Sequence, residues 1–228
     1  MSDAGVQSRG IATQSPRRMV GPRRVILALA IIFLLAPAIA WFARPASVLD
    51  LSVGNRLARS GLAESWARGD VIVLLRHAER CDRSKRTCLG PSNGITLHGS
   101  AIATQLGSVF SGLGLANADV LSSTTLRTQQ TAQFVFGQPA LTQEWLFKCT
   151  GDVLGKAMAQ KNTQRNLVLV THSECFDRLE QQLGISDTTD NPYASTLFVQ
   201  IGGEGARPKI LGFMHARKWL TLAALDRS

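Results

Sequence analysis

Two histidines in this sequence directly follow short apolar runs, and arginines stand beside the first of them. The run at 71–75 leads into Arg76 and His77, with Arg80 three residues further on, and a later run leads into His172. A guanidinium group stays charged at any working pH and can pair its donors with phosphate oxygens. A neutral imidazole is a nucleophile that can form a covalent intermediate. These residue types in this arrangement indicate chemistry on a phosphate group.

A third polar cluster, at 122–127, contains Arg127 and also follows a short segment with the composition of a strand. In open α/β sheets, ligands bind at the carboxyl ends of the strands. If the three segments are neighbouring parallel strands, one pocket gathers two histidines and three arginines. Phosphoryl transfer depends mainly on positioning and on charge neutralisation. The arginines and His172 can provide both, so we expect neither a metal ion nor a cofactor.

The alternative is that these residues have no catalytic role, because an arginine and a histidine after a strand are often surface residues in ion pairs. Histidines at two strand ends and an arginine at the third argue against that alternative. The two remaining histidines, His98 and His215, are interpreted as solvent-exposed or hairpin residues outside the site.

Apolar periodicity and turn residues predict strands that alternate with helices. Continuous apolar runs rich in β-branched residues predict fully buried strands at 71–75 and 166–170. Thr96 is expected to cap a helix that ends near 112–114. The other expected elements are helices at 55–68, 125–136, 152–160 and 174–183, a short strand at 119–122, an extended segment at 140–146, and a hairpin of strands 196–201 and 209–214. This alternation predicts a single α/β domain built as a three-layer α/β/α sandwich.

The N-terminus is expected to be a targeting segment and not part of the fold. Residues 1–24 are basic, with five arginines against one aspartate, and 25–43 is a run of 19 residues without a charge. Such a sequence is typical of a signal peptide or a membrane anchor whose preceding charges stay in the cytoplasm. A buried core helix is the alternative, but no polar residues mark a solvent face. We therefore expect 44–69 to be a linker and helix, 70–228 to be the folded domain, and both to lie outside the cytoplasm.

The net charge indicates which classes of partner the protein can be expected to bind. The formal net charge is +9, and about +5 of it follows residue 24. This excess suits anionic partners such as phosphates or membrane headgroups. Nucleic acid is not expected, because no basic cluster is interleaved with aromatic residues and Tyr193 is the only tyrosine.

Four cysteines, an even number, allow three pairings into two disulfides: Cys81, Cys88, Cys149 and Cys175. Disulfides persist outside the cytoplasm, where this domain is expected. A zinc site is the alternative, but no C-x-x-C pair is present and the spacings are irregular. We expect disulfides.

Four motifs resemble those of the histidine phosphatase superfamily, which is phosphoglycerate-mutase-like. They occur in the family's order and are RHAER at 76–80, ITLHG at 95–99, SSTTLRTQQTA at 122–132 and LVLVTHS at 167–173. The resemblance implies that His77 is the nucleophile and becomes a phosphohistidine. It also implies that the phosphate is held by His172 and three arginines, which are Arg76, Arg80 and Arg127.

A narrower resemblance is to the lipopolysaccharide core heptose(II)-phosphate phosphatases, and it is carried by RHAERCDRS at 76–84, the cysteines and the N-terminal segment. It implies a periplasmic phosphomonoesterase, either soluble after cleavage or anchored to the inner membrane, that acts on a phosphorylated glycan of the lipopolysaccharide core. The alternatives are a phosphatase of another sugar phosphate or of a phosphoprotein, and a non-catalytic module that binds anions. The simplest cysteine pairing is Cys81–Cys88, beside Arg80, and Cys149–Cys175, beside His172.

One position departs from the family pattern. Many relatives carry a glutamate in an L-x-E motif after the third strand, and this glutamate protonates the leaving oxygen. Here 146–148 reads Leu-Phe-Lys, with Lys148 in place of the glutamate. Asp152 is the first substitute that we consider for the catalytic acid, and Glu174 and Glu79 are the others. Asp152 is equally well explained as the N-cap of the helix that follows it.

Overall fold

The computed structural model describes residues 47–186, 189–202 and 205–219, together with Arg23 and Phe33. The chain divides into two units, Met1–Arg44 and Pro45–Ser228, and the fold below belongs to the second. The predicted basic region 1–24 and the predicted signal or anchor segment 25–43 lie outside the described residues, apart from those two positions. Among the described residues, no helix is both long and apolar enough to cross a membrane.

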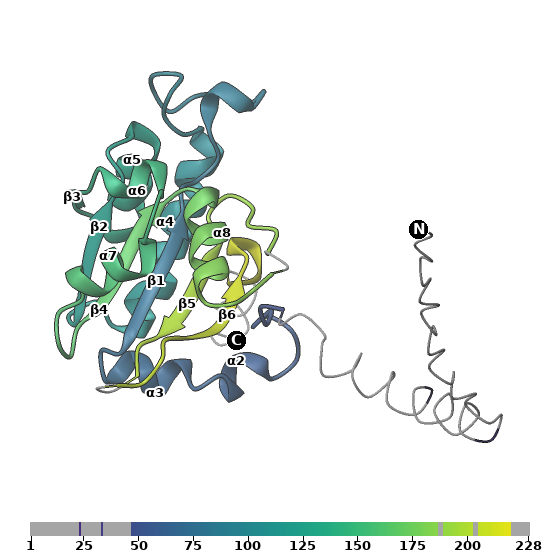
Figure 1. Cartoon of the computed structure of the whole chain (residues 1–228). Coiled ribbons are helices and arrows are strands. Elements are labelled where there is room, and N and C mark those ends of the chain that lie inside the picture. Colours follow the sequence, from purple (N-terminus) through teal and green to yellow (C-terminus); the bar gives the residue numbers. More distant parts are fainter. Residues whose placement is uncertain (1–22, 24–32, 34–46, 187–188, 203–204, 220–228) are drawn as a thin grey trace, which may run out of the picture. The chain divides into compact units, whose positions relative to one another are not determined.

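A six-stranded sheet forms the centre of the domain (Figure 1). Its strands are β1 Val71–Arg76, β2 Ala118–Ser122, β3 Leu141–Thr142, β4 Asn166–Thr171, β5 Thr196–Gln200 and β6 Lys209–Met214. They lie in the order β3-β2-β4-β1-β5-β6. The first four strands along the chain are parallel, whereas β5 is antiparallel to both of its neighbours. The carboxyl ends of β1, β2 and β4 therefore meet at one edge, and the start of β5 lies at the same edge.

Helices cover both faces of the sheet (Figure 1). One hydrophobic core lies between the sheet and the helices α3 Leu62–Ala67, α4 Leu97–Leu113 and α5 Leu126–Phe136. A second core lies between the opposite face and the helices α6 Trp145–Lys148, α7 Val153–Gln160 and α8 Ser173–Gln182. The predicted three-layer α/β/α sandwich is confirmed.

Burial on both faces explains why β1 is a continuous apolar run. Val73 and Leu75 belong to the first core, and Ile72 and Leu74 belong to the second. Because side chains alternate between the two faces of a strand, a strand covered on both sides is apolar throughout. The residues of β4 are likewise all buried. The two strands predicted to be fully buried are therefore confirmed.

Two predicted elements differ from the structure. The helix expected at 55–68 is divided into α2 (Arg56–Arg59) and α3, because Gly61 between them has a φ of 73°. The segment 140–146, expected to be extended, contains only the two residues of β3 before the chain turns into α6. This early turn places Leu146 in the second core with no exposed surface.

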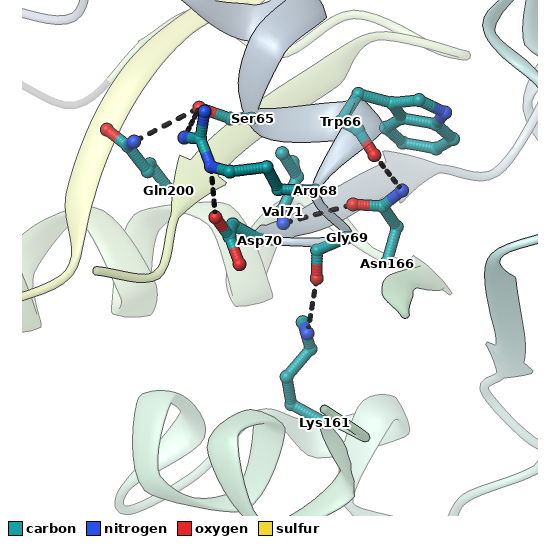
Figure 2. Close-up of polar contacts among 9 residues, drawn as sticks. All are labelled: Ser65, Trp66, Arg68, Gly69, Asp70, Val71, Lys161, Asn166 and Gln200. Atoms are coloured by element: carbon teal, nitrogen blue, oxygen red, sulfur yellow. Dashed lines mark hydrogen bonds and ion pairs between the residues drawn. The ribbon is translucent and has the colours of Figure 1, made fainter. Parts of the chain in front are cut away.

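A buried side chain joins β1 and β4 at the end of the sheet opposite the predicted site (Figure 2). Asn166, the first residue of β4, is fully buried. Its side-chain nitrogen donates to the carbonyl of Trp66 at 2.9 Å, and its Oδ1 accepts from the N–H of Val71 at 3.1 Å. Nearby, Lys161 Nζ donates to the carbonyl of Gly69 at 2.7 Å. These bonds fix the start of β1 against the start of β4, and so they also fix where the two strands end.

The structure contains both disulfides that the sequence predicts. Cys81–Cys88 has a Cα–Cα distance of 5.2 Å and closes part of the loop between β1 and α4. Cys149–Cys175 has a Cα–Cα distance of 5.0 Å and joins the end of α6 to the first turn of α8. The first disulfide directly follows Arg80, and the second anchors the helix that begins after His172.

Candidate active site

The two predicted histidines lie side by side at the carboxyl ends of β1 and β4. Arg76 and Thr171 are partners in the parallel ladder, so His77 and His172 each follow directly from a paired position. The N–H of His77 donates to the carbonyl of Thr171 at 2.9 Å. The two imidazole rings have centroids 5.2 Å apart, and the residues are 3% and 4% exposed. The register of the sheet therefore places two buried imidazoles next to each other.

Hydrogen bonds define which nitrogen of His77 carries the proton. Its Nδ1 lies 2.8 Å from the carbonyl oxygen of Ala78, which can only accept, so Nδ1 is the protonated donor. The Nε of Arg127, which can only donate, lies 3.3 Å from the Nε2 of His77. The lone pair of His77 is therefore on Nε2, beside a guanidinium group.

The same reasoning assigns the proton of His172 to its other nitrogen. Arg127 Nη2 donates to the Nδ1 of His172 at 3.3 Å, so Nδ1 carries the lone pair. The Nε2 of His172 then carries the proton and donates to the Oγ of Ser123 at 3.0 Å. Ser123 directly follows β2 and is fully buried. Arg127, in the first turn of α5, thus contacts both histidines.

Burial keeps both histidines uncharged at neutral pH. Desolvation is the largest cause that lowers the pKa of His77 well below its ordinary value of 6.5, and nearby cations lower it further. Desolvation and then the charge of Arg127 lower the pKa of His172 to about 4. An unprotonated imidazole is the nucleophilic form, so the burial of His77 favours the state that chemistry on phosphate requires.

Arg76 is held by the segment that precedes β5. Its guanidinium group lies 4.6 Å from the centre of the Tyr193 ring, and its Nη1 donates to the carbonyl of Asn191. Its Nε is a buried donor that has no acceptor among the described residues. Tyr193 also packs on His77, and the centroids of the two rings are 5.5 Å apart. Arg76 therefore has a fixed position and an unused donor.

These residues line a cavity of about 170 Å³, which we call the phosphate cavity. Its lining includes four arginines and one carboxylate, which are Arg76, Arg80, Arg83, Arg127 and Glu174. Arg80 is oriented by Asp82, which accepts from its Nε at 2.8 Å and from its Nη2 at 2.5 Å. The size of the cavity and its excess of positive charge suit a phosphate group.

The structure brings together all the predicted site residues except Asp152. The carboxylate of Asp152 caps α7, where its Oδ1 accepts from the N–H of Gly155 at 2.8 Å and from Gln182 Nε2 at 3.2 Å. Asp152 does not line the phosphate cavity, so the structure does not place it beside the other predicted site residues. Its place at the start of a helix and its acidic side chain explain the capping role.

The two other candidate acids have different surroundings. Glu79 accepts from Thr96 Oγ1 at 2.8 Å and from Ser84 Oγ at 3.2 Å, and it does not line the phosphate cavity. Glu174 does line that cavity and contacts Ser173, whose Oγ lies 3.3 Å from its Oε2. Glu174 is therefore the carboxylate that lies within reach of a bound phosphate ester.

Sequence reasoning missed five residues of the site, which are Arg83, Ser123, Phe147, Ser173 and Tyr193. The predicted hairpin contained part of the information needed to place Tyr193. Because β5 returns antiparallel beside β1, the residues just before β5 lie at the carboxyl edge of the parallel strands. Phe147 packs against His172, with ring centroids 5.8 Å apart, and its place could not be predicted because α6 was expected to be extended.

Solved structures of two phosphatases share the fold of this domain. Protein histidine phosphatase SixA complexed with tungstate superimposes with a TM-score of 0.51 at 16% identity, over 64% of this chain and 97% of that one. Phosphoserine phosphatase from Entamoeba histolytica in complex with 3-phosphoglyceric acid superimposes with a TM-score of 0.50 at 14% identity, over 65% and 98% of the two chains. No family model matches the chain.

Curated relatives define the family more narrowly. The lipopolysaccharide core heptose(II)-phosphate phosphatase of Escherichia coli O157:H7 is 35% identical over 155 residues, which are 67% of this chain and 73% of the relative. The protein of that name from Escherichia coli strain K12 / DH10B has the same identity over the same length. The chain belongs to the family of the lipopolysaccharide core heptose(II)-phosphate phosphatases.

Proposed function

We propose that this protein removes phosphate from a lipopolysaccharide core heptose through a covalent phosphohistidine at His77. The observation that carries the proposal is the contact between His77 Nε2 and Arg127 inside a cavity lined by arginines. Nε2 bears the lone pair, is uncharged at neutral pH, and lies where the arginines would hold a phosphate. A histidine in a surface ion pair would instead have an acidic partner and a raised pKa.

The first step is the transfer of the phosphoryl group to the enzyme. The lone pair on His77 Nε2 forms a bond to phosphorus while the bond from phosphorus to the sugar oxygen breaks. The leaving oxygen takes a proton from Glu174. In the second step a water molecule gives a proton back to Glu174 and attacks phosphorus, and the bond to Nε2 breaks. Inorganic phosphate leaves, and the enzyme returns to its starting state.

The arginines stabilise the charge on the transferred group. Arg127 and Arg80 extend from different elements toward the same small cavity. The buried Nε of Arg76 gains an acceptor when a phosphate oxygen enters. The proton on His172 Nε2 is directed to Ser123 in this structure, and a small rotation of the ring redirects it to a phosphate oxygen. Positively charged donors placed in advance account for most of the rate enhancement in phosphoryl transfer.

The proposed acid is Glu174. It lines the phosphate cavity beside the two histidines, whereas Asp152 is engaged as a helix cap and Glu79 as a loop acceptor. Glu174 thus takes the role that Lys148 cannot fill at the position of the family's L-x-E motif.

The proposed place of action is the periplasm. Three features support it, which are the curated relatives' substrate, the two disulfides, and the sequence of 1–43 with its basic start and uncharged run. The segment 25–43 would either be cleaved as a signal peptide or hold the domain, 70–228, at the inner membrane. The excess positive charge of the chain would raise its local concentration at an anionic glycan surface.

Phosphate release from purified lipopolysaccharide tests this function directly. The wild-type protein should release phosphate from the core, and mass spectrometry of the core oligosaccharide should show the loss of one heptose-linked phosphate. Release from soluble sugar phosphates or phosphoproteins but not from lipopolysaccharide would overturn the substrate and leave the phosphatase. Binding of phosphate without turnover of any ester would identify the protein as an anion-binding module instead.

A further inference from the structure

A second, larger cavity lies beside the phosphate cavity and shares a wall with it. It has a volume of about 400 Å³ and is lined by the start of α4, the segment before β5 and the segment after β6. Tyr193 lines both cavities, and Ala78, which directly follows the nucleophile, lines the larger one. Tyr193 is thus the residue common to the phosphate cavity and to this space, which we call the flanking cavity.

The walls of the flanking cavity have the composition of a small-molecule site. Apolar surface comes from Ile102 of α4 and from Ala216, and polar groups come from His98 and His215. The volume falls within the range of about 300–1,000 Å³ that is usual for ligand pockets. His98 and His215, which the sequence suggested to be solvent or hairpin residues, thus lie on a wall next to the reacting group.

Two side chains of the flanking cavity have polar groups to offer a ligand. The Nδ1 of His215 is buried, and no residue in the described part of the chain forms a hydrogen bond with it. A buried polar atom without a partner costs free energy, and a ligand hydroxyl would offset that cost. Lys218 is exposed at the same wall and forms no ion pair with any described residue.

The carboxylate of the flanking cavity is engaged elsewhere. Glu79 accepts a hydrogen bond from Thr96 and lies 3.6 Å from the Nε of Arg86. Its negative charge is therefore compensated within the wall, and Lys218 contributes a positive charge that is not. A negative group on a ligand in this cavity would be attracted to Lys218.

We propose that the flanking cavity is a specificity subsite, which binds the glycan beyond the hydrolysed phosphate and favours a sugar that carries a second anionic group. Lys218 pairs with that group, His215 Nδ1 accepts from a sugar hydroxyl, and Tyr193 forms the ridge between the two subsites. This inference rests on the proposed function, because it assumes that the phosphate cavity holds the reacting phosphate.

Paired sugar substrates test the subsite. We expect the wild-type kcat/KM for glucose 1,6-bisphosphate to exceed that for glucose 6-phosphate, and we expect Lys218→Glu to lower the ratio of the two values about tenfold. Lys218→Arg should keep the ratio within about twofold of wild type. The matched control is Lys209→Glu, which makes the same charge change at an exposed residue on β6 and should leave the ratio unaltered.

Calorimetric binding of the same two sugars to the His77→Gln variant gives a readout that does not depend on turnover. Lys218→Glu in that background should weaken the bisphosphate selectively, again about tenfold. Equal losses for both sugars, or an equal loss in the Lys209 control, would overturn the subsite. One further outcome is that the wild-type protein hydrolyses no ester while Lys218→Glu still weakens binding of the bisphosphate selectively by about tenfold. In that case the proposed function would fail and the subsite would stand.

Discussion

Arg127 Nε donates a hydrogen bond to the Nε2 of His77 over 3.3 Å, and its Nη2 donates to the Nδ1 of His172 over the same distance. One guanidinium group from α5 therefore fixes the orientation of two imidazoles from two different strands. It also prevents either imidazole from presenting a proton at those nitrogens. In the proposed mechanism, this arrangement prepares His77 for attack before any substrate enters.

His77→Ala is expected to abolish turnover, with a loss of at least about a thousandfold, because it removes the nitrogen that forms the covalent intermediate in the proposed mechanism. Acid-labile phosphate should appear on His77 of the wild-type protein when turnover is quenched rapidly. The far-ultraviolet circular dichroism of the variant should match wild type. Full activity in the variant would contradict the mechanism.

Glu174→Gln is expected to lower kcat about a hundredfold for alkyl and sugar phosphates, since these leaving groups need a proton. The loss should be much smaller for p-nitrophenyl phosphate, whose leaving group is stable as an anion. Asp152→Asn serves as the comparison, because Asp152 caps α7 and does not line the phosphate cavity. It should leave kcat unchanged, and the reverse pattern would restore Asp152 as the acid.

Acid should destabilise the fold through His172. Its pKa is about 4 in the folded protein and about 6.5 in the unfolded chain, so below pH 6.5 the unfolded chain binds a proton that the folded protein does not. Stability is therefore full above pH 6.5 and is lost as the pH falls toward 4. At pH 5 the loss from this group should be about 2 kcal/mol. Urea unfolding of wild type and His172→Asn at pH 7 and 5 measures it, and an equal loss in both proteins would refute the assignment.

Activity is expected to survive chelation, because the arginines of the phosphate cavity supply the charge that a metal ion would otherwise supply. Dialysis against EDTA, followed by an assay with p-nitrophenyl phosphate, should leave kcat/KM within about twofold of the untreated value. Inactivation by EDTA and recovery with a divalent ion would show that a metal takes part.

Removal of the Cys149–Cys175 disulfide is expected to destabilise the protein by about 3 kcal/mol, because the bond closes a loop with a sequence separation of 26 residues. The double variant Cys149→Ala/Cys175→Ala keeps the buried positions apolar and isolates this effect. The matched change at Cys81 and Cys88, separated by seven residues, should cost less. Peptide mapping without reduction checks both pairings in the native protein.

The sequence predicts the parts of the fold that obey a local rule. The apolar runs of β1 and β4 follow from burial on both faces. Thr96 precedes α4 and caps it as predicted, because its Oγ1 accepts from the N–H of Gly99 at 2.9 Å. The segment around Leu146 could not be predicted in the same way. Its conformation depends on the second core, between the sheet and the helices α6, α7 and α8, which only the folded chain contains.

The residues of the site also separate into those that the sequence predicts and those that it does not. Residues that directly follow parallel strands, such as His77 and His172, can be placed from the sequence because strand ends converge. Tyr193 could be placed only by knowing that β5 pairs antiparallel with β1, and the sequence predicts the hairpin but not that pairing. Asp152 shows most clearly what the sequence alone does not decide. An aspartate before a helix has the same sequence context whether it caps the helix or delivers a proton, and only its distance from the cavity separates the two.

The position of β1 between β4 and β5 determines the order in which parts of the domain can fold. Its hydrogen-bonding neighbours come from residues 166–171 and 196–200, far along the chain from 71–76. Such distant pairings form slowly, because a long loop must close before they contribute any stabilisation. During synthesis β1 therefore waits for most of the domain to follow it. Until β4 and β5 have been made, His77 lacks the neighbours His172 and Tyr193, so the site is assembled late.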